Sequence, residues 1–160
     1  MLTHLKFLER VATEKKHTYV STGMATYADI DKAVDIFKKH NCPFTLMHTV
    51  STYPCKEEET NIAQMLSLRE RYKCAVGYSG HEAGVHPTML AAALGADAIE
   101  RHITLDRAMY GSDQAASLEK RGLEIVANFI HATEAAFGTG EKVFGDAEKA
   151  VAKKLRYFET

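Results

Sequence analysis

The sequence predicts an α/β protein built on a parallel β-sheet. Short apolar runs typical of buried strands alternate along the chain with longer segments that have helical periodicity, the pattern of right-handed βαβ units. The strand-like runs are Thr18–Ser21, Phe44–His48, Ala75–His81 and Ala98–Glu100. Four parallel strands are half of an eight-stranded (β/α) barrel, and they also fit a small open sheet. No GxGxxG turn follows the first strand, which disfavours a dinucleotide-binding fold.

Helix signals surround the first two strands. From Leu2 to Thr13, apolar side chains recur every three or four residues and predict a helix. After the first strand, Thr26 is followed three residues later by Asp29, a spacing typical of a helix N-cap. The segment ending in Pro43 breaks this second helix before the next strand begins.

The rest of the chain continues the alternation, with two long loops after strands. Pro87 stands in the first turn of one predicted helix, where a missing N–H costs least. The predicted helices are Ile62–Tyr72, Pro87–Leu94, Leu118–Phe137 and a weak one at Ala150–Leu155, and the loops are Thr49–Thr60 and Leu105–Ser117.

Composition limits the classes of function. The chain has 160 residues, 46% of them hydrophobic and 26% charged, which is ordinary for one globular domain. A formal net charge of −1 gives no support to binding of nucleic acid or anionic membranes, and no apolar run is long enough to span a bilayer. The charged, amphipathic start is not a signal peptide, so we expect a cytoplasmic protein. Three cysteines without CxxC spacing argue against a disulfide scaffold or structural zinc site.

Two histidines carry the clearest chemical signal. His81 and His102 each close a short apolar run, and a helical stretch separates the runs. If the strands are parallel neighbours, both imidazoles emerge at the same edge of the sheet. This geometry predicts a metal site.

The segments at the strand ends form a series that closely resembles the sialic acid synthase family. They are STGMA at 21–25, HTVSTYP at 48–54, GYSGH at 77–81, ERHITLDR at 100–107 and GSDQAASLE at 111–119. Their order and spacing are similar to those of N-acetylneuraminate synthase and its spore-coat-polysaccharide and legionaminate relatives, from the first residues to about Gly140. The match is specific because it joins several separate loop motifs.

The resemblance implies a (β/α)8 TIM-type barrel. In that family the barrel condenses phosphoenolpyruvate with an N-acylated hexosamine such as N-acetylmannosamine, giving a nine-carbon 2-keto sugar acid and inorganic phosphate. It also implies a divalent metal, usually manganese, held by His81 and His102, which would be the catalytic residues as well as the metal ligands. Such an ion acts as a Lewis acid that polarises the aldehyde oxygen and templates both reactants.

The same resemblance assigns substrate-binding residues. Ser21 and Ser79 match serines that contact phosphoenolpyruvate, while Tyr53 and Asp113 match residues that hold the amino sugar. Ser51 is also expected to bind substrate, although many family members have Asn at that position. A second departure is the sequence Ser-Gly-His at 79–81, where many members have Ser-Asp-His. Both departures indicate a subfamily variation that bears on the choice of sugar.

Length is the larger departure. We expect residues 1–160 to form a partial barrel, strands 5–8 with their helices, without the antifreeze-like C-terminal domain. The family's early Glu and phosphate-gripping lysines belong to the first four βα units. The alternative is therefore a non-catalytic half-barrel, a fragment or split subunit whose partner supplies strands 1–4. Open edges predict self-association into a homo-oligomer or pairing with a partner half-barrel. A third interpretation is an unrelated small α/β binding protein.

Other polar residues have structural interpretations. His48 ends a strand, but a core or supporting role is favoured over metal ligation. Glu100-Arg101 is interpreted as an inward-facing pair, because two charges near the end of a buried strand need each other or a site. Asp106-Arg107 is expected to form a loop-fixing ion pair, and His86 to cap a helix.

Overall fold

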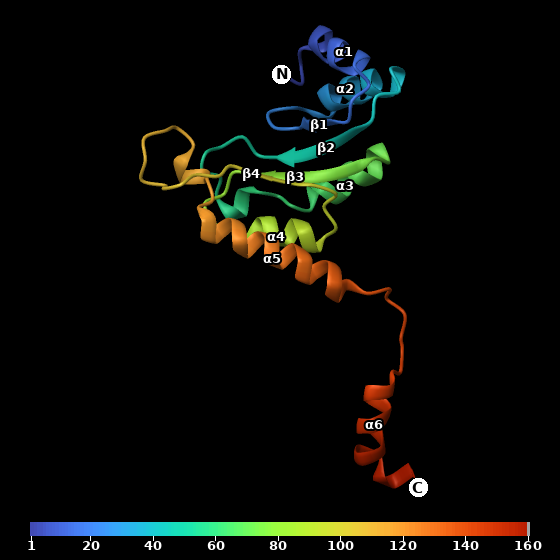
Figure 1. The fold of residues 1–160 in the computed structure, drawn as a ribbon. Coiled ribbons are helices and arrows are strands. Elements are labelled where there is room, and N and C mark those ends of the chain that lie inside the picture. Colours follow the sequence, from blue (N-terminus) through green and yellow to red (C-terminus); the bar gives the residue numbers. More distant parts are fainter. Residues whose placement is uncertain (160) are drawn as a thin grey trace.

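A computed structural model describes residues 1–159, and its centre is one parallel four-stranded sheet. The strands lie side by side in chain order, β1-β2-β3-β4, as the sequence predicts (Figure 1). Their bounds are β1 Thr18–Ser21, β2 Phe44–Thr49, β3 Ala75–Gly80 and β4 Ile99–Arg101. The fold is thus an α/β half-barrel in which every strand pair is parallel.

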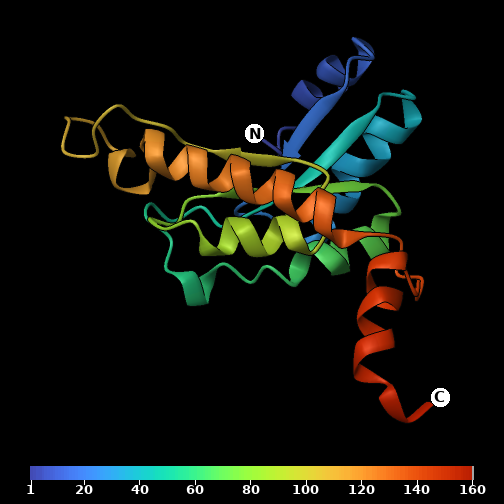
Figure 2. The same ribbon diagram turned by 60° about the horizontal axis from the view of Figure 1, so that its bottom comes forward.

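Helices connect the strands and cover one face of the sheet. They are α1 Leu5–Thr13, α2 Tyr27–Lys39, α3 Gln64–Tyr72, α4 His86–Ala93, α5 Lys120–Phe137 and α6 Asp146–Leu155, with short 3₁₀ turns at Glu57–Glu59, Gln114–Ala116 and Tyr157–Glu159. Both views show α5 lying along α4, whereas α6 projects away from the sheet (Figures 1 and 2). Across residues 1–159, no helix is both long and apolar enough to cross a membrane.

Local capping chemistry sets where the first helices begin. Thr26 and Asp29 form the expected capping box: the Asp29 amide donates to Thr26 Oγ1 (3.3 Å), and the Thr26 amide donates to Asp29 Oδ2 (3.0 Å). Helix α1 begins at Leu5, three residues later than the periodicity of Leu2 suggests. The reason is that His4 caps the amino end of the helix. Its Nδ1 accepts a hydrogen bond at 3.1 Å from the Phe7 amide, which has no partner within the helix, so the helix begins at the next residue.

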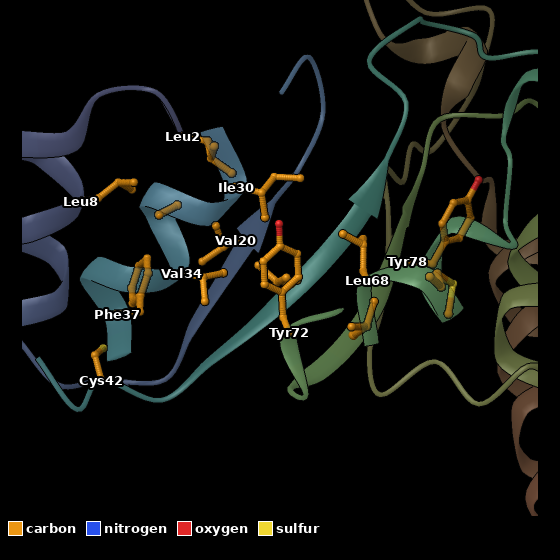
Figure 3. Close-up of a cluster of buried hydrophobic side chains, with 14 of the residues drawn as sticks. Leu2, Leu8, Val20, Ile30, Val34, Phe37, Cys42, Leu68, Tyr72 and Tyr78 are labelled. Atoms are coloured by element: carbon orange, nitrogen blue, oxygen red, sulfur yellow. The ribbon is translucent and has the colours of Figure 1, made fainter. Parts of the chain in front are cut away.

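The two faces of the sheet have different partners. Alternate strand residues point toward the helices and form the hydrophobic core (Figure 3). Strand residues of this outward set include Val20, Leu46, Val76 and Tyr78, and helix residues packed around them include Ile30, Val34, Phe37 and Leu68. The intervening strand residues point to the opposite, inner face, where the sequence places the candidate site.

His48 belongs to the helix-facing set, which confirms its core role. Its side chain is buried, and Nε2–H donates to the Thr60 carbonyl at 2.8 Å. Nδ1 has no partner within residues 1–159. Burial lowers the pKa of this imidazole below its ordinary value of 6.5, because a proton on Nδ1 would place an unpaired charge in the core.

Two smaller expectations are corrected by the structure. Asp106 and Arg107 do not hold the loop as an ion pair: Asp106 Oδ1 accepts the Ala108 amide at 2.8 Å, while the Arg107 guanidinium donates to the Ala115 carbonyl. Adjacent side chains in a turn diverge, so each finds a backbone partner instead. His86 is the first residue of α4 rather than its cap, and its ring faces Glu57 at 3.3 Å.

We predict that His48 makes the stability of the fold depend on pH. With a folded pKa below 6.5, the unfolded chain binds the extra proton, so stability is full above about pH 6.5 and falls as pH drops toward the folded pKa. A His48→Gln variant, whose amide can still donate to Thr60, should lack this component. Urea unfolding at several pH values would show a difference in slope of at most about 1.4 kcal/mol per pH unit. Parallel profiles for the two proteins would contradict the prediction.

Candidate metal and substrate site

A pocket opens at the carboxyl ends of the strands and brings most of the predicted site residues together. Its volume is about 420 Å³. Six predicted residues line it: Ser21, Ser51, Tyr53, Ser79, His81 and His102. Asp113 lies beside this group, with Oδ2 3.8 Å from Nδ1 of His102. All seven therefore gather at one edge of the sheet, where parallel strands of α/β proteins place their sites.

Strand register explains the polar row at the base of the pocket. Thr49 pairs with Ser79, and Ser79 pairs with Glu100, so the three side chains share the inner face across β2, β3 and β4. The Ser79 hydroxyl donates to Glu100 Oε1 at 2.7 Å.

The two histidines lie against each other and against Tyr53. The imidazole centroids of His81 and His102 are 5.2 Å apart, with the rings nearly perpendicular at 80°. The Tyr53 ring packs on His81 at 4.1 Å and meets the edge of His102 at 5.8 Å. Burial raises the pKa of the Tyr53 phenol, and the charges of Asp113 and Glu100 act in the same direction. Tyr53 thus stays protonated and can donate a hydrogen bond.

His81 has the hydrogen bonding of a metal ligand. Its Nδ1–H donates to the carbonyl of Val50 at 2.8 Å, and this bond selects the tautomer whose Nε2 lone pair is free. Metal-bound histidines are usually oriented in this way by a second acceptor. His102 is less enclosed, with its side chain 35% exposed and Asp113 near its Nδ1. The two rings thus lie side by side at the strand-end edge, 5.2 Å apart between centroids.

Within residues 1–159, the candidate metal ligands in the pocket are the imidazoles of His81 and His102. No group of three or more His, Cys, Asp or Glu side chains in that range is arranged to hold an ion. The donor set fits a first-row divalent metal that keeps several positions open. Water, substrate or another part of the protein would fill those positions around a bound ion.

The charged side chains that line the pocket are acidic rather than basic. No Lys or Arg side chain is found among the described residues that line it, whereas Glu100 does line it. Its neutral donors include the hydroxyl groups of Ser21, Ser51 and Tyr53, while the Ser79 hydroxyl bonds Glu100.

The structure corrects one prediction and adds two residues. Glu100 and Arg101 are not an inward pair: Glu100 points into the pocket, while Arg101 points to the helix side and bonds Glu82 at 2.9 Å. Successive residues of a strand face opposite ways, so the two charges cannot share one face. Sequence reasoning missed Thr49 and the pocket role of Glu100. Both could have been found from the alternation of strand side chains. Glu100 is two residues before His102 and so shares its face, and Thr49 directly follows the neighbouring predicted strand at the same edge.

The sequence profile of the NeuB family matches residues 1–142, which include every residue of the pocket. This chain belongs to the NeuB family. The match extends over the four strands and all helices except α6.

Members of the NeuB family similar to this chain include named synthases of acidic sugars. It is 37% identical over 151 residues to the N,N'-diacetyllegionaminic acid synthase of Campylobacter jejuni, covering 92% of this chain and 45% of that protein. It is 33% identical to the N-acetylneuraminate-9-phosphate synthase of Homo sapiens, covering 93% of this chain and 42% of that protein.

Solved structures of the family agree with this fold. A crystal structure of N-acetylneuraminic acid (sialic acid) synthetase from Leptospira borgpetersenii superposes with a TM-score of 0.86 at 31% identity, covering 99% of this chain and 55% of that one. The chain thus spans about half the length of the relatives it matches.

We predict that His81 and His102 together bind one divalent metal ion. Replacing both with Ala should abolish Mn²⁺ binding by the chain in titration calorimetry, because no other pair of imidazoles lines the pocket. The matched control is a His86→Ala/His131→Ala variant, which removes two exposed imidazoles and should bind like the parent chain. Equal affinity in the two double variants would refute the assignment.

Proposed function

We propose that this chain supplies the metal- and sugar-binding half of a sialic-acid-synthase-type enzyme. The reaction condenses phosphoenolpyruvate with an N-acylated hexosamine resembling N-acetylmannosamine, and gives a nine-carbon 2-keto sugar acid and inorganic phosphate. In barrel terms the chain corresponds to strands 5–8 of a (β/α)8 fold. The observation that carries the proposal is the convergence of His81 and His102 at the strand-end edge, inside a pocket of hydroxyl donors.

Each residue has a role that its chemistry supports. The Ser21 hydroxyl donates to phosphate or carboxylate oxygens of phosphoenolpyruvate. The Ser79 hydroxyl, whose one hydrogen bonds Glu100 in this structure, does the same after it turns from Glu100 to the substrate. Asp113 is about half exposed beside His102 and accepts hydroxyl hydrogens of the sugar, which fixes the face of the aldehyde that is presented. A bound manganese ion would polarise the aldehyde oxygen. Tyr53 stacks on His81 and donates its phenolic hydrogen toward the sugar.

The charge of the pocket indicates that this half does not act alone. Phosphoenolpyruvate carries a phosphate and a carboxylate, and the described lining contributes no cationic side chain to them. We therefore infer that cations reach the site from another polypeptide segment, the first four βα units. The two edge strands, β1 and β4, are where such a segment would pair.

A second candidate function is a split subunit or a non-catalytic half-barrel. The same observations favour it, because the described residues contain one half of a site and two open sheet edges. If no different partner supplies the other half, two copies of this chain would pair as a homo-oligomer.

We predict that the isolated chain releases no measurable phosphate from phosphoenolpyruvate with N-acetylmannosamine and Mn²⁺. Losing one electrostatic contact of this kind typically costs about a hundredfold or more in rate, and several are missing here. Adding a polypeptide with the first four βα units of a relative should restore turnover in a phosphate-release assay. The control is the same addition to the His81→Ala/His102→Ala chain, which should stay inactive. Efficient synthesis by the 160-residue chain alone would overturn the need for a partner.

In the complemented enzyme, Asp113→Asn should weaken use of the sugar more than use of phosphoenolpyruvate. A hydrogen bond to a charged acceptor contributes roughly 1.5–3 kcal/mol, so the KM for sugar should rise about ten- to a hundredfold. Asp106→Asn is the matched control, since its carboxylate is engaged with the Ala108 amide in the same loop. A larger effect on the KM for phosphoenolpyruvate would reverse the assigned role.

A further inference from the structure

A buried ion pair lies on the helix-facing side of the sheet, just outside the pocket. It joins Glu82 and Arg101, whose side chains are 0% and 3% exposed, with 2.9 Å between Oε1 and Nη1. Among the described residues, no polar side chain that lines the pocket forms a hydrogen bond with Glu82 or Arg101. Nothing in the proposed reaction uses it as a reacting group.

Both partners are held by further bonds. Glu82 Oε1 also accepts the hydroxyl of Thr88 at 2.6 Å, and Oε2 accepts the hydroxyl of Tyr78 at 2.9 Å. The guanidinium of Arg101 donates to the carbonyls of Gly84 (3.0 Å) and of Glu82 itself. The pair therefore fastens the side chains and the backbone after β3 to the end of β4.

The position of the pair in the sequence connects it to the histidines. Glu82 directly follows His81, and Arg101 directly precedes His102. Since neighbouring residues at a strand end face opposite sides, the pair lies behind the sheet while both imidazoles lie in the pocket. Because Arg101 also bonds the carbonyls of Glu82 and Gly84, the pair couples the backbone beside His81 to the backbone beside His102.

We propose that Glu82 and Arg101 are positioning residues that set the separation of the His81 and His102 imidazoles. Ligand groups need to be held within about half an ångström of their productive geometry, which two flexible strand ends would not achieve without such a support. The role as a support for metal binding rests on the function proposed above, while the effect on the ring separation does not.

Two observations favour this role over simple stabilisation. A buried ion pair often contributes no more stability than apolar side chains of similar volume, and here Arg101 Nε is left without a partner in the described structure. The strand is also shaped around the pair: a Cβ on Gly80 would lie 2.5 Å from Glu82 Oε2 and 3.0 Å from Arg101 Cδ. Glycine at position 80 thus leaves room for this pair.

The test compares two chemically identical substitutions. Arg101→Lys keeps the charge but loses the planar fork that bonds Glu82 and two carbonyls. Arg69→Lys is the control. Arg69, on α3, pairs with Asp97 just before β4 at 2.9 Å and donates to the Val76 carbonyl of β3 at 3.4 Å, near the amino ends of the two strands and away from the pocket. Nuclear Overhauser contacts among the rings of His81 and His102 are measured in the full chain, without metal.

We expect Arg101→Lys to lose the contacts between the two imidazole rings and Arg69→Lys to retain them. A Glu82→Met/Arg101→Met variant, which replaces the pair with apolar side chains, should fold and also lose the ring contacts. Retained contacts in either Arg101 variant would overturn the proposal. Loss of the fold in the double Met variant would also overturn it, since the pair would then serve the fold itself. Equal loss of ring contacts in Arg69→Lys would overturn it as well.

Metal titration separates this inference from the proposed function. If His81 and His102 bind Mn²⁺, Arg101→Lys should weaken binding roughly 10- to 100-fold, as loss of a supporting residue behind a ligand does, and Arg69→Lys should not. If the parent chain binds no Mn²⁺ while its ring contacts depend on Arg101, the positioning role stands and the metal assignment fails. If Mn²⁺ binds equally to parent and Arg101→Lys chains, the positioning role fails and the metal assignment stands.

Discussion

The two-residue alternation of parallel strands in fixed register is the constraint on which the rest of this structure depends. It sends Ser79 and Glu100 to the same inner face, where their side chains bond at 2.7 Å. One residue further along each strand, the side-chain direction reverses, so Arg101 faces the helices. A slip of one residue in the β3–β4 pairing would bring Arg101 to the pocket and bury Glu100. The chemistry of the site and the composition of the core are therefore decided by one register.

Local signals were sufficient to predict the elements and the gathering of the site. Alternating periodicity predicted the four strands and their order, and the Thr26–Asp29 spacing predicted a capping box, because these depend on neighbours within a few residues. His81 and His102 were predicted to meet because parallel strands share an edge. The Glu82–Arg101 bond was not predicted, since the two residues are 19 positions apart and their pairing depends on side-chain reach across a formed sheet. Instead, adjacency in sequence suggested the wrong partner, Glu100.

The two faces of the sheet differ in charge at the carboxyl ends of β3 and β4. On the helix side, Arg101 neutralises Glu82 in an environment without water access. On the pocket side, Glu100 and Asp113 are near the imidazoles, and no described lining residue is cationic. A pocket lined in this way favours cations and neutral groups over anions. Under the function proposed above, the positive charge that meets a phosphate would come from outside residues 1–159.

The inner face also shows why the candidate site residues gather at one end of the sheet. Deeper along the strands, Met47 fills the space beside Gly77, where an added Cβ would lie 2.6 Å from the Met47 sulfur and 2.5 Å from the Ala98 carbonyl. Glycine on one strand and a long apolar side chain on its neighbour thus pack the interior layer. One step toward the carboxyl ends, the pattern changes to Thr49, Ser79 and Glu100, whose shorter or polar side chains do not close the layer. The change from a filled layer to a polar one occurs within two residues of each strand, and it determines both the floor and the lining of the site.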